Sequence, residues 1–167
     1  MTALGERYHP QVLALLPVVV TAGWVALIIA APIVPGWAGA FVYGLGSFIC
    51  HQIPERSFHL AGFQLPVCAR CLGIYVGVAG GVAFVRIRRG SGRAVAQMPR
   101  RELQWLAALA AAPTLVTVAL EMVGAWHPSN STRALAGAPL GVLVGLVVMN
   151  ALGRPGEAVR RGPASMM

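Results

Sequence analysis

Residues 12–34 read VLALLPVVVTAGWVALIIAAPIV, an apolar run without a single charged side chain. A helix rises about 1.5 Å per residue and the hydrocarbon core of a bilayer is about 30 Å thick, so about 20 apolar residues are enough to cross it. Three further stretches meet this requirement, at 67–85, 103–123 and 134–152. The sequence therefore predicts four transmembrane helices.

The composition of the whole chain agrees with this reading. Of the 167 residues, 57% are hydrophobic and only 11% are charged, whereas a soluble domain carries about 25% charged residues. The formal net charge of +8 comes from arginines that flank the apolar runs, where they orient a membrane protein, and it does not indicate a nucleic-acid partner. We expect residues 1–167 to form one all-α integral membrane domain, a helix bundle in contact with the lipid bilayer.

A fifth apolar stretch, at 36–50, is too short to be a regular span. At about 1.5 Å per residue it reaches only about 22 Å. Pro32 and Pro35 precede it and Pro54 follows it, and proline favours helix ends. We interpret this stretch as a re-entrant or interfacial half-helix, with a tilted short span as the alternative.

The arginines predict an orientation. They gather between the second and third predicted spans and in the tail at 153–167: Arg86, Arg88, Arg89, Arg93, Arg100, Arg101, Arg154, Arg160 and Arg161. By the positive-inside rule both regions are cytoplasmic, and four spans put both termini there. We expect this topology in a bacterial cytoplasmic membrane, with 51–66 and 124–133 on the outer face.

All three cysteines fall in one window, as Cys50-His51 and then Cys68-Ala-Arg-Cys71. Cys68 and Cys71 open the second predicted span at positions i and i+3, so they share a helix face. The half-helix and the span form a hairpin that can bring Cys50 to them. Three thiolates and a histidine suit a soft metal, most simply zinc. The predicted ligands are Cys50, His51, Cys68 and Cys71, with His59 and His127 as alternatives to His51.

Two other interpretations of the cysteines stay open. In one, Cys68 and Cys71 form a redox-active pair that exchanges electrons with a quinone or a partner thiol, with Cys50 as the resolving thiol. In the other, one disulfide staples the hairpin and the remaining thiol is inert. An odd number of cysteines favours the metal over the staple.

Polar residues that do not resemble membrane anchors lie mainly in the two outer segments, near the end of the third predicted span and, as Arg70, at the start of the second. Glu121 is an ionisable residue within a span, which is costly and indicates function. Arg133 follows on the outer side, where it can pair with Glu121 or bind an anion. The sequence offers six candidates that would support the metal or contact a lipid or other membrane-borne substrate: Glu55, Arg56, Arg70, Glu121, Asn130 and Arg133.

Small residues define one face of the fourth predicted span. Gly137, Gly141 and Gly145 recur at every fourth position, and such a stripe lets another helix approach closely. The partner helix belongs either to the same chain or to a second copy. A non-enzymatic bundle that binds a partner through this face is the third functional hypothesis.

The run from Cys50 through His51, Pro54, Arg56 and Phe58 to Gly62-Phe-Gln-Leu-Pro-Val-Cys-Ala-Arg-Cys71 resembles the signature of a family of small prokaryotic membrane proteins, domain of unknown function 2085. Ser129-Asn130, Arg133 and Gly137 resemble the family's closing motif. The resemblance implies a membrane protein. Its pattern includes the following residues: Cys50, His51, Arg56, Cys68, Arg70 and Cys71.

This chain departs from the family pattern at two places. Leu72 stands where the pattern has a threonine. The pattern's aspartate of the third span has no matching aspartate here, and Glu121 is the candidate to replace it. His59 and His127 do not match the pattern, so the resemblance favours His51 over them as a ligand. The resemblance assigns no activity.

Overall fold

The computed structural model describes residues 5–90 and 99–152, and these form an almost entirely helical fold. The α-helices are α1 (Gly5–Ala30), α2 (Trp37–Ser47), α3 (Ala69–Gly90), α4 (Arg100–Met122) and α5 (Asn130–Leu152). Two short 3₁₀ helices, η1 (Ala31–Ile33) and η2 (Pro54–Arg56), and a hairpin of β1 (His59–Leu60) and β2 (Phe63–Gln64) complete the fold.

Four helices are long and apolar enough to cross a membrane, as predicted. The candidate spans are Leu15–Ile33, Ala69–Arg88, Arg101–Met122 and Asn130–Leu152. The short stretch at 36–50 contains α2, whose 11 residues reach only about 16 Å, so the half-helix is also confirmed. The predicted tail at 153–167 and Arg93 lie outside the described residues.

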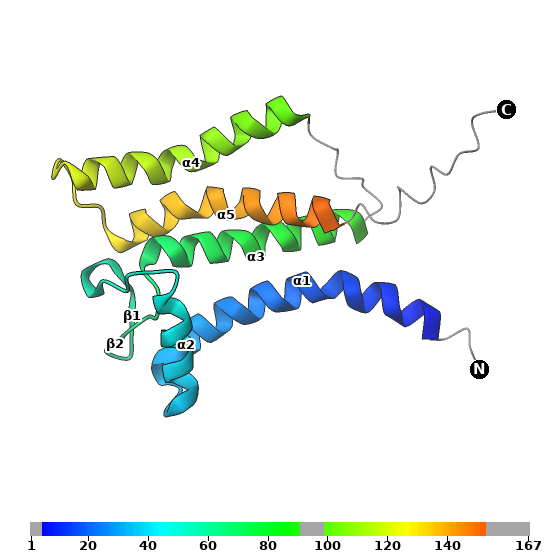
Figure 1. Cartoon of the computed structure of the whole chain (residues 1–167), viewed down its shortest axis with the longest axis horizontal. Helices are drawn as coiled ribbons and strands as arrows, with labels where there is room; N and C mark the ends of the chain where they lie inside the picture. Colours follow the sequence, from blue (N-terminus) through cyan, green and yellow to red (C-terminus); the bar gives the residue numbers. More distant parts are fainter. Residues whose placement is uncertain (1–4, 91–98, 153–167) are drawn as a thin grey trace.

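The four long helices lie side by side in the order α1, α3, α5, α4 (Figure 1). Helices α3 and α5 run parallel to each other, and α1 and α4 run in the opposite direction. The hairpin, α2 and the turn between α4 and α5 gather at one end of this layer, while α1 and α4 begin at the other. Large apolar side chains stay exposed on the outward faces; Val19, Leu109 and Leu135 are each exposed by about two thirds or more. These faces contact the lipid bilayer.

The tightest packing joins α3 to α5 through two glycine stripes. Gly73, Gly77 and Gly81 of α3 lie against the backbone of α5, and the predicted stripe of Gly137, Gly141 and Gly145 lies against the backbone of α3. A Cβ atom added at Gly145 would lie 2.5 Å from the Val78 carbonyl oxygen. Only glycine permits such an approach.

The face that the sequence offered to a second copy is therefore filled by α3 of the same chain. Gly137, Gly141 and Gly145 are all buried. Within one copy of the chain α3 occupies this face, and a homo-oligomer through these glycines stays a prediction.

Two segments are more ordered than the sequence predicted. The outer segment 51–66, for which no regular element was predicted, holds η2 and a β-hairpin whose turn residues Ala61 and Gly62 both have positive φ, as a two-residue type I′ turn requires. Helix α5 begins at Asn130 rather than 134, because the Ser129 hydroxyl caps it by accepting the Thr132 N–H at 3.2 Å. Arg133 consequently lies within a helix.

Candidate functional site

The three cysteines meet at the end of the bundle where α2 and α3 come together. Their sulfur atoms all lie within 4.8 Å of one another. Cys50 follows α2, Cys68 directly precedes α3, and Cys71 lies in the first turn of α3. We call these three residues the thiol cluster.

Two local features bring Cys50 to the start of α3. Gly46 of α2 lies so close to the Pro66 carbonyl that a Cβ atom would clash with it. The Gln52 amide then bridges the segments by donating to the carbonyl oxygens of Tyr43 at 2.7 Å and Pro66 at 2.8 Å. The Tyr43 hydroxyl donates to the Gln64 carbonyl and joins the hairpin to α2.

Hydrogen bonds from the chain hold two of these sulfurs and favour the anionic form of Cys68. The Cys50 sulfur accepts the backbone N–H of Cys68 at 3.2 Å and that of Gln52 at 3.5 Å. A hydrogen bond from the Cys71 side chain, assisted by backbone N–H groups, lowers the pKa of Cys68 to about 5 against the opposing effect of burial. A lowered pKa favours the thiolate of Cys68, and the thiolate is the form that binds metals.

Apolar side chains surround the thiol cluster. Cys50 is only 8% exposed and belongs to a core cluster with Ile28 of α1 and Val67. Trp24 and Tyr75 pack against this core in an edge-to-face pair with ring centroids 6.1 Å apart. The site is thus enclosed on the α1 side.

The histidines do not join the thiols in this structure. His51 is exposed, and the group of potential ligand atoms that lie together contains the three cysteines without it. His59 is exposed on β1, and His127 lies in the wall of a separate cleft near Glu121.

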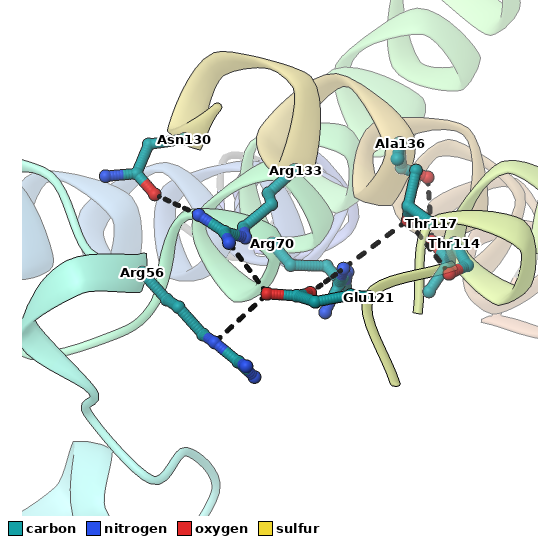
Figure 2. Close-up of polar contacts among 8 residues, drawn as sticks. All are labelled: Arg56, Arg70, Thr114, Thr117, Glu121, Asn130, Arg133 and Ala136. Carbon is teal, nitrogen blue, oxygen red and sulfur yellow. Dashed lines mark hydrogen bonds and ion pairs between the residues drawn. The ribbon is translucent and has the colours of Figure 1, made fainter. Parts of the chain in front are cut away.

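A second polar cluster surrounds Glu121 near the end of α4 (Figure 2). One carboxylate oxygen accepts from Arg133 at 2.7 Å and pairs with Arg56 at 3.1 Å, and the other pairs with Arg70 at 3.4 Å. Glu121 is only 5% exposed at its side chain. We call Glu121 and these arginines the arginine cluster; it confirms the predicted pairing of Arg133 with Glu121.

Hydrogen bonds hold the arginine cluster in place. Asn130 accepts from Arg133 at 2.9 Å and donates to the carbonyl of the fully buried Ser57 at 2.9 Å. The Thr117 hydroxyl lies 3.4 Å from a guanidinium nitrogen of Arg70. Sequence reasoning missed Ser57 and Thr117, although Thr117 precedes Glu121 by four residues and therefore shares its helix face.

The structure separates the predicted residues into two groups on opposite flanks of α3. Five of the six polar candidates belong to the arginine cluster or hydrogen-bond to it, on the side of α3 that faces α4 and α5. The thiols lie on the side of α3 that faces α1. Arg70 lies between Cys68 and Cys71 in sequence, but about 100° per residue of helix rotation turns it away from them. Glu55 is exposed and forms part of the wall of a cleft beside the cluster.

This cleft has a volume of about 650 Å³. Its wall combines residues of η2, the end of α4 and the start of α5: Ile53, Glu55, Arg56, Glu121, His127, Pro128, Ser129, Asn130 and Arg133. An open cleft with charged residues in its wall can admit a charged group from the membrane boundary.

The family described as "Predicted membrane protein (DUF2085)" matches residues 50–147, which include both clusters. An uncharacterized protein of Methanocaldococcus jannaschii is 33% identical over 97 residues, 58% of this chain and 58% of that protein. An uncharacterized protein of Methanothermobacter thermautotrophicus is 34% identical over 102 residues, 61% of this chain and 84% of that protein. No solved structure matches the chain significantly.

Proposed function

This chain belongs to the DUF2085 family of predicted membrane proteins, and from that premise we propose that it is a membrane metalloprotein. Its thiol cluster binds one soft transition-metal ion, most simply zinc. The observation that carries the proposal is the convergence of three sulfur atoms within 4.8 Å, one from the segment after α2, one from the loop before α3 and one from the first turn of α3.

The dimensions of the cluster suit such an ion. Zinc binds thiolate sulfur at about 2.3 Å in tetrahedral geometry, which places two sulfur ligands about 3.8 Å apart. The sulfurs already lie within 4.8 Å of one another, so a shift of about 1 Å or less would complete the geometry. The two backbone N–H groups that Cys50 accepts supply the outer hydrogen bonds that metal thiolates require.

The fourth coordination position decides the chemistry. His51, which follows Cys50 directly, is the predicted ligand, and its exposed side chain must turn inward to bind. Four protein ligands would make the site structural, whereas three would leave a position for water or substrate. A metal with an open position could polarise a carbonyl or phosphoryl group of a membrane-borne substrate.

Elemental analysis of the protein, purified in detergent after expression with zinc in the medium, tests the proposal. We expect about one zinc ion per chain, lost in Cys68→Ser and in Cys50→Ser. His51→Ala and His59→Ala form a matched pair, since both histidines are exposed. If His51 is a ligand, only His51→Ala lowers the zinc content. A wild-type protein without any bound transition metal would contradict the proposal.

A thiol–disulfide oxidoreductase is the second candidate. Cys68 and Cys71 are partly accessible and adjacent, whereas Cys50 is buried. Oxidation of the Cys68 thiolate and the Cys71 thiol to a disulfide would release two electrons and one proton, and a quinone would take these up together with one proton from water to become a quinol. This candidate predicts a metal-free protein whose Cys68–Cys71 bond forms with added quinone and is broken by a dithiol. Zinc that survives both treatments would reject it.

A further inference from the structure

The arginine cluster has more positive charge than its single carboxylate can neutralise. Arg56, Arg70 and Arg133 all pair with Glu121, and three positive charges against one negative charge leave a surplus of +2. Glu55 also borders the cleft, but it is exposed to solvent. Because Arg133 and Arg70 have side chains that are only 9% and 16% exposed, water does little to screen the surplus, and a second anion would be strongly favoured there.

Two of these arginines also keep unused donors. The Nε atoms of Arg70 and Arg133 are buried and have no hydrogen-bond partner among the described residues. A buried N–H group without an acceptor is costly and uncommon in folded proteins. The cluster therefore lacks acceptor atoms as well as negative charge.

We propose that the arginine cluster and its cleft bind the phosphate group of a phosphate ester. The guanidinium groups come from η2, α3 and α5 and approach from different sides (Figure 2). This arrangement suits a tetrahedral oxyanion, which presents oxygens in several directions, better than a planar carboxylate. Helix α5 begins at Asn130 on the cleft wall, and its N-terminus further favours an anion.

The position of the cleft gives the phosphate two possible sources. Glu121 lies one residue before the end of the third candidate span, and Asn130 begins the fourth. This is the depth at which phospholipid headgroups lie. Arg56, which is 44% exposed, can also meet a soluble phosphate ester that enters from water. The chemistry recognised is the same in both cases.

Ligand-induced stabilisation in phosphate-free detergent micelles tests the proposal. The probes are phosphatidylglycerol, diacylglycerol of the same chain length, and glycerol 3-phosphate. We expect phosphatidylglycerol to raise the Tm in a saturable manner and diacylglycerol to leave it unchanged. Displacement of the lipid by glycerol 3-phosphate shows that the phosphate ester alone is recognised, and failure of that displacement assigns the site to the lipid headgroup.

The variants decide whether the arginine cluster is responsible. Arg56→Gln and Arg133→Lys should each weaken phosphatidylglycerol binding about tenfold or more. The first variant loses a charge-assisted hydrogen bond, and the second keeps the charge but loses the forked geometry of the guanidinium group. Arg101→Gln, an exposed arginine at the other end of α4, should bind like wild type. Unchanged affinity in both cluster variants, or equal binding of diacylglycerol, would overturn the proposal. The zinc content of Arg56→Gln should equal that of wild type, so this site and the thiol cluster fail independently.

Discussion

Glu121 is the single residue on which the outer end of the bundle depends most. Its carboxylate joins α4 to arginines of η2, α3 and α5. At 5% side-chain exposure it has little contact with solvent, so the attraction to its partners is weakly screened. Its removal would leave three positive charges close together.

We expect Glu121→Gln to lower the free energy of unfolding by about 3 kcal/mol, because breaking a buried ion pair leaves an uncompensated charge. The measurement is the loss of Tm in detergent, converted with the unfolding enthalpy. Glu102→Gln is the matched control, since Glu102 is an exposed carboxylate at the start of the same helix. Equal stability of the two variants would show that Glu121 does not hold the cluster together.

The sequence predicted the candidate site residues better than their grouping. The spacing of Cys68 and Cys71 was enough to expect that they share a helix face. The predicted helical hairpin of the half-helix and the second span indicated Cys50 as the third member. Arg70 could be placed on a different face by helix geometry alone, but its partner could not be found. Glu121 lies 51 residues away, and periodicity within one helix says nothing of which distant helix packs against it.

Among the elements, α2 matters most for the thiol cluster, although it contributes no sulfur itself. Its close approach to Pro66 at Gly46 fixes Cys50 beside Cys68. Cys50 is anchored to the same glycine, since its backbone N–H donates to the Gly46 carbonyl at 2.9 Å. The position of one ligand therefore depends on a residue four positions earlier.

Gly46→Ala should reduce zinc binding without altering any ligand. The added methyl group would meet the Pro66 carbonyl, so α2 and Cys50 must shift away from α3. Gly44→Ala has open space around its Cβ position and should retain full zinc content. Elemental analysis of both variants side by side checks this. Full metal occupancy in Gly46→Ala would show that the α2 contact does not position Cys50.

The glycine stripes make the α3–α5 pair the most tightly packed unit of the bundle. We expect Gly141→Ala to destabilise the protein by about 2 kcal/mol, because its Cβ would meet the Ile74 carbonyl and force the helices apart. Gly80→Ala in α3 has no neighbour within 4 Å and should be neutral or slightly stabilising, since alanine favours the helix. Comparison of the two Tm values in detergent checks the prediction. A Gly141→Ala variant as stable as Gly80→Ala would contradict the packing.

At the scale of the whole molecule, both clusters lie at the same end of the bundle. The thiol cluster lies between α1 and α3, and the arginine cluster joins η2, α3, α4 and α5. The predicted orientation would place this end outside the cytoplasm, because Arg86, Arg88 and Arg101 flank the opposite end of the spans.

Reporter fusions test this orientation. Green fluorescent protein fused at the C-terminus of the full chain should fluoresce, and alkaline phosphatase at the same position should be inactive. Alkaline phosphatase inserted after Gly124, in the turn between α4 and α5, should be active. The reverse pattern would place both clusters on the cytoplasmic side and would exclude an oxidising surrounding for the thiols.

The overall fold followed from the sequence because the length and apolarity of a span are local properties. The four spans and the half-helix were found from runs of residues alone, with ends wrong by a few positions. The order α1, α3, α5, α4 could not be found in this way. The order depends on which helices pack together through their glycines. The stripe of Gly73, Gly77 and Gly81 in α3 fits the stripe of similar spacing in α5, and this fit is visible only in three dimensions.

The glycine-to-glycine junction divides the molecule mechanically. Helices α3 and α5 share backbone contact along three successive turns, so they should behave as one stiff spine, to which α1 and α4 attach by side chains. The sulfur atoms lie on the side of α3 that contacts α1, and the guanidinium groups of Arg70 and Arg133 lie where α3 and α5 meet α4. Either outer helix could therefore move to admit or release a ligand while α3 and α5 stay packed together. Because the first turn of α3 borders both clusters, a ligand bound at one cluster would affect the other.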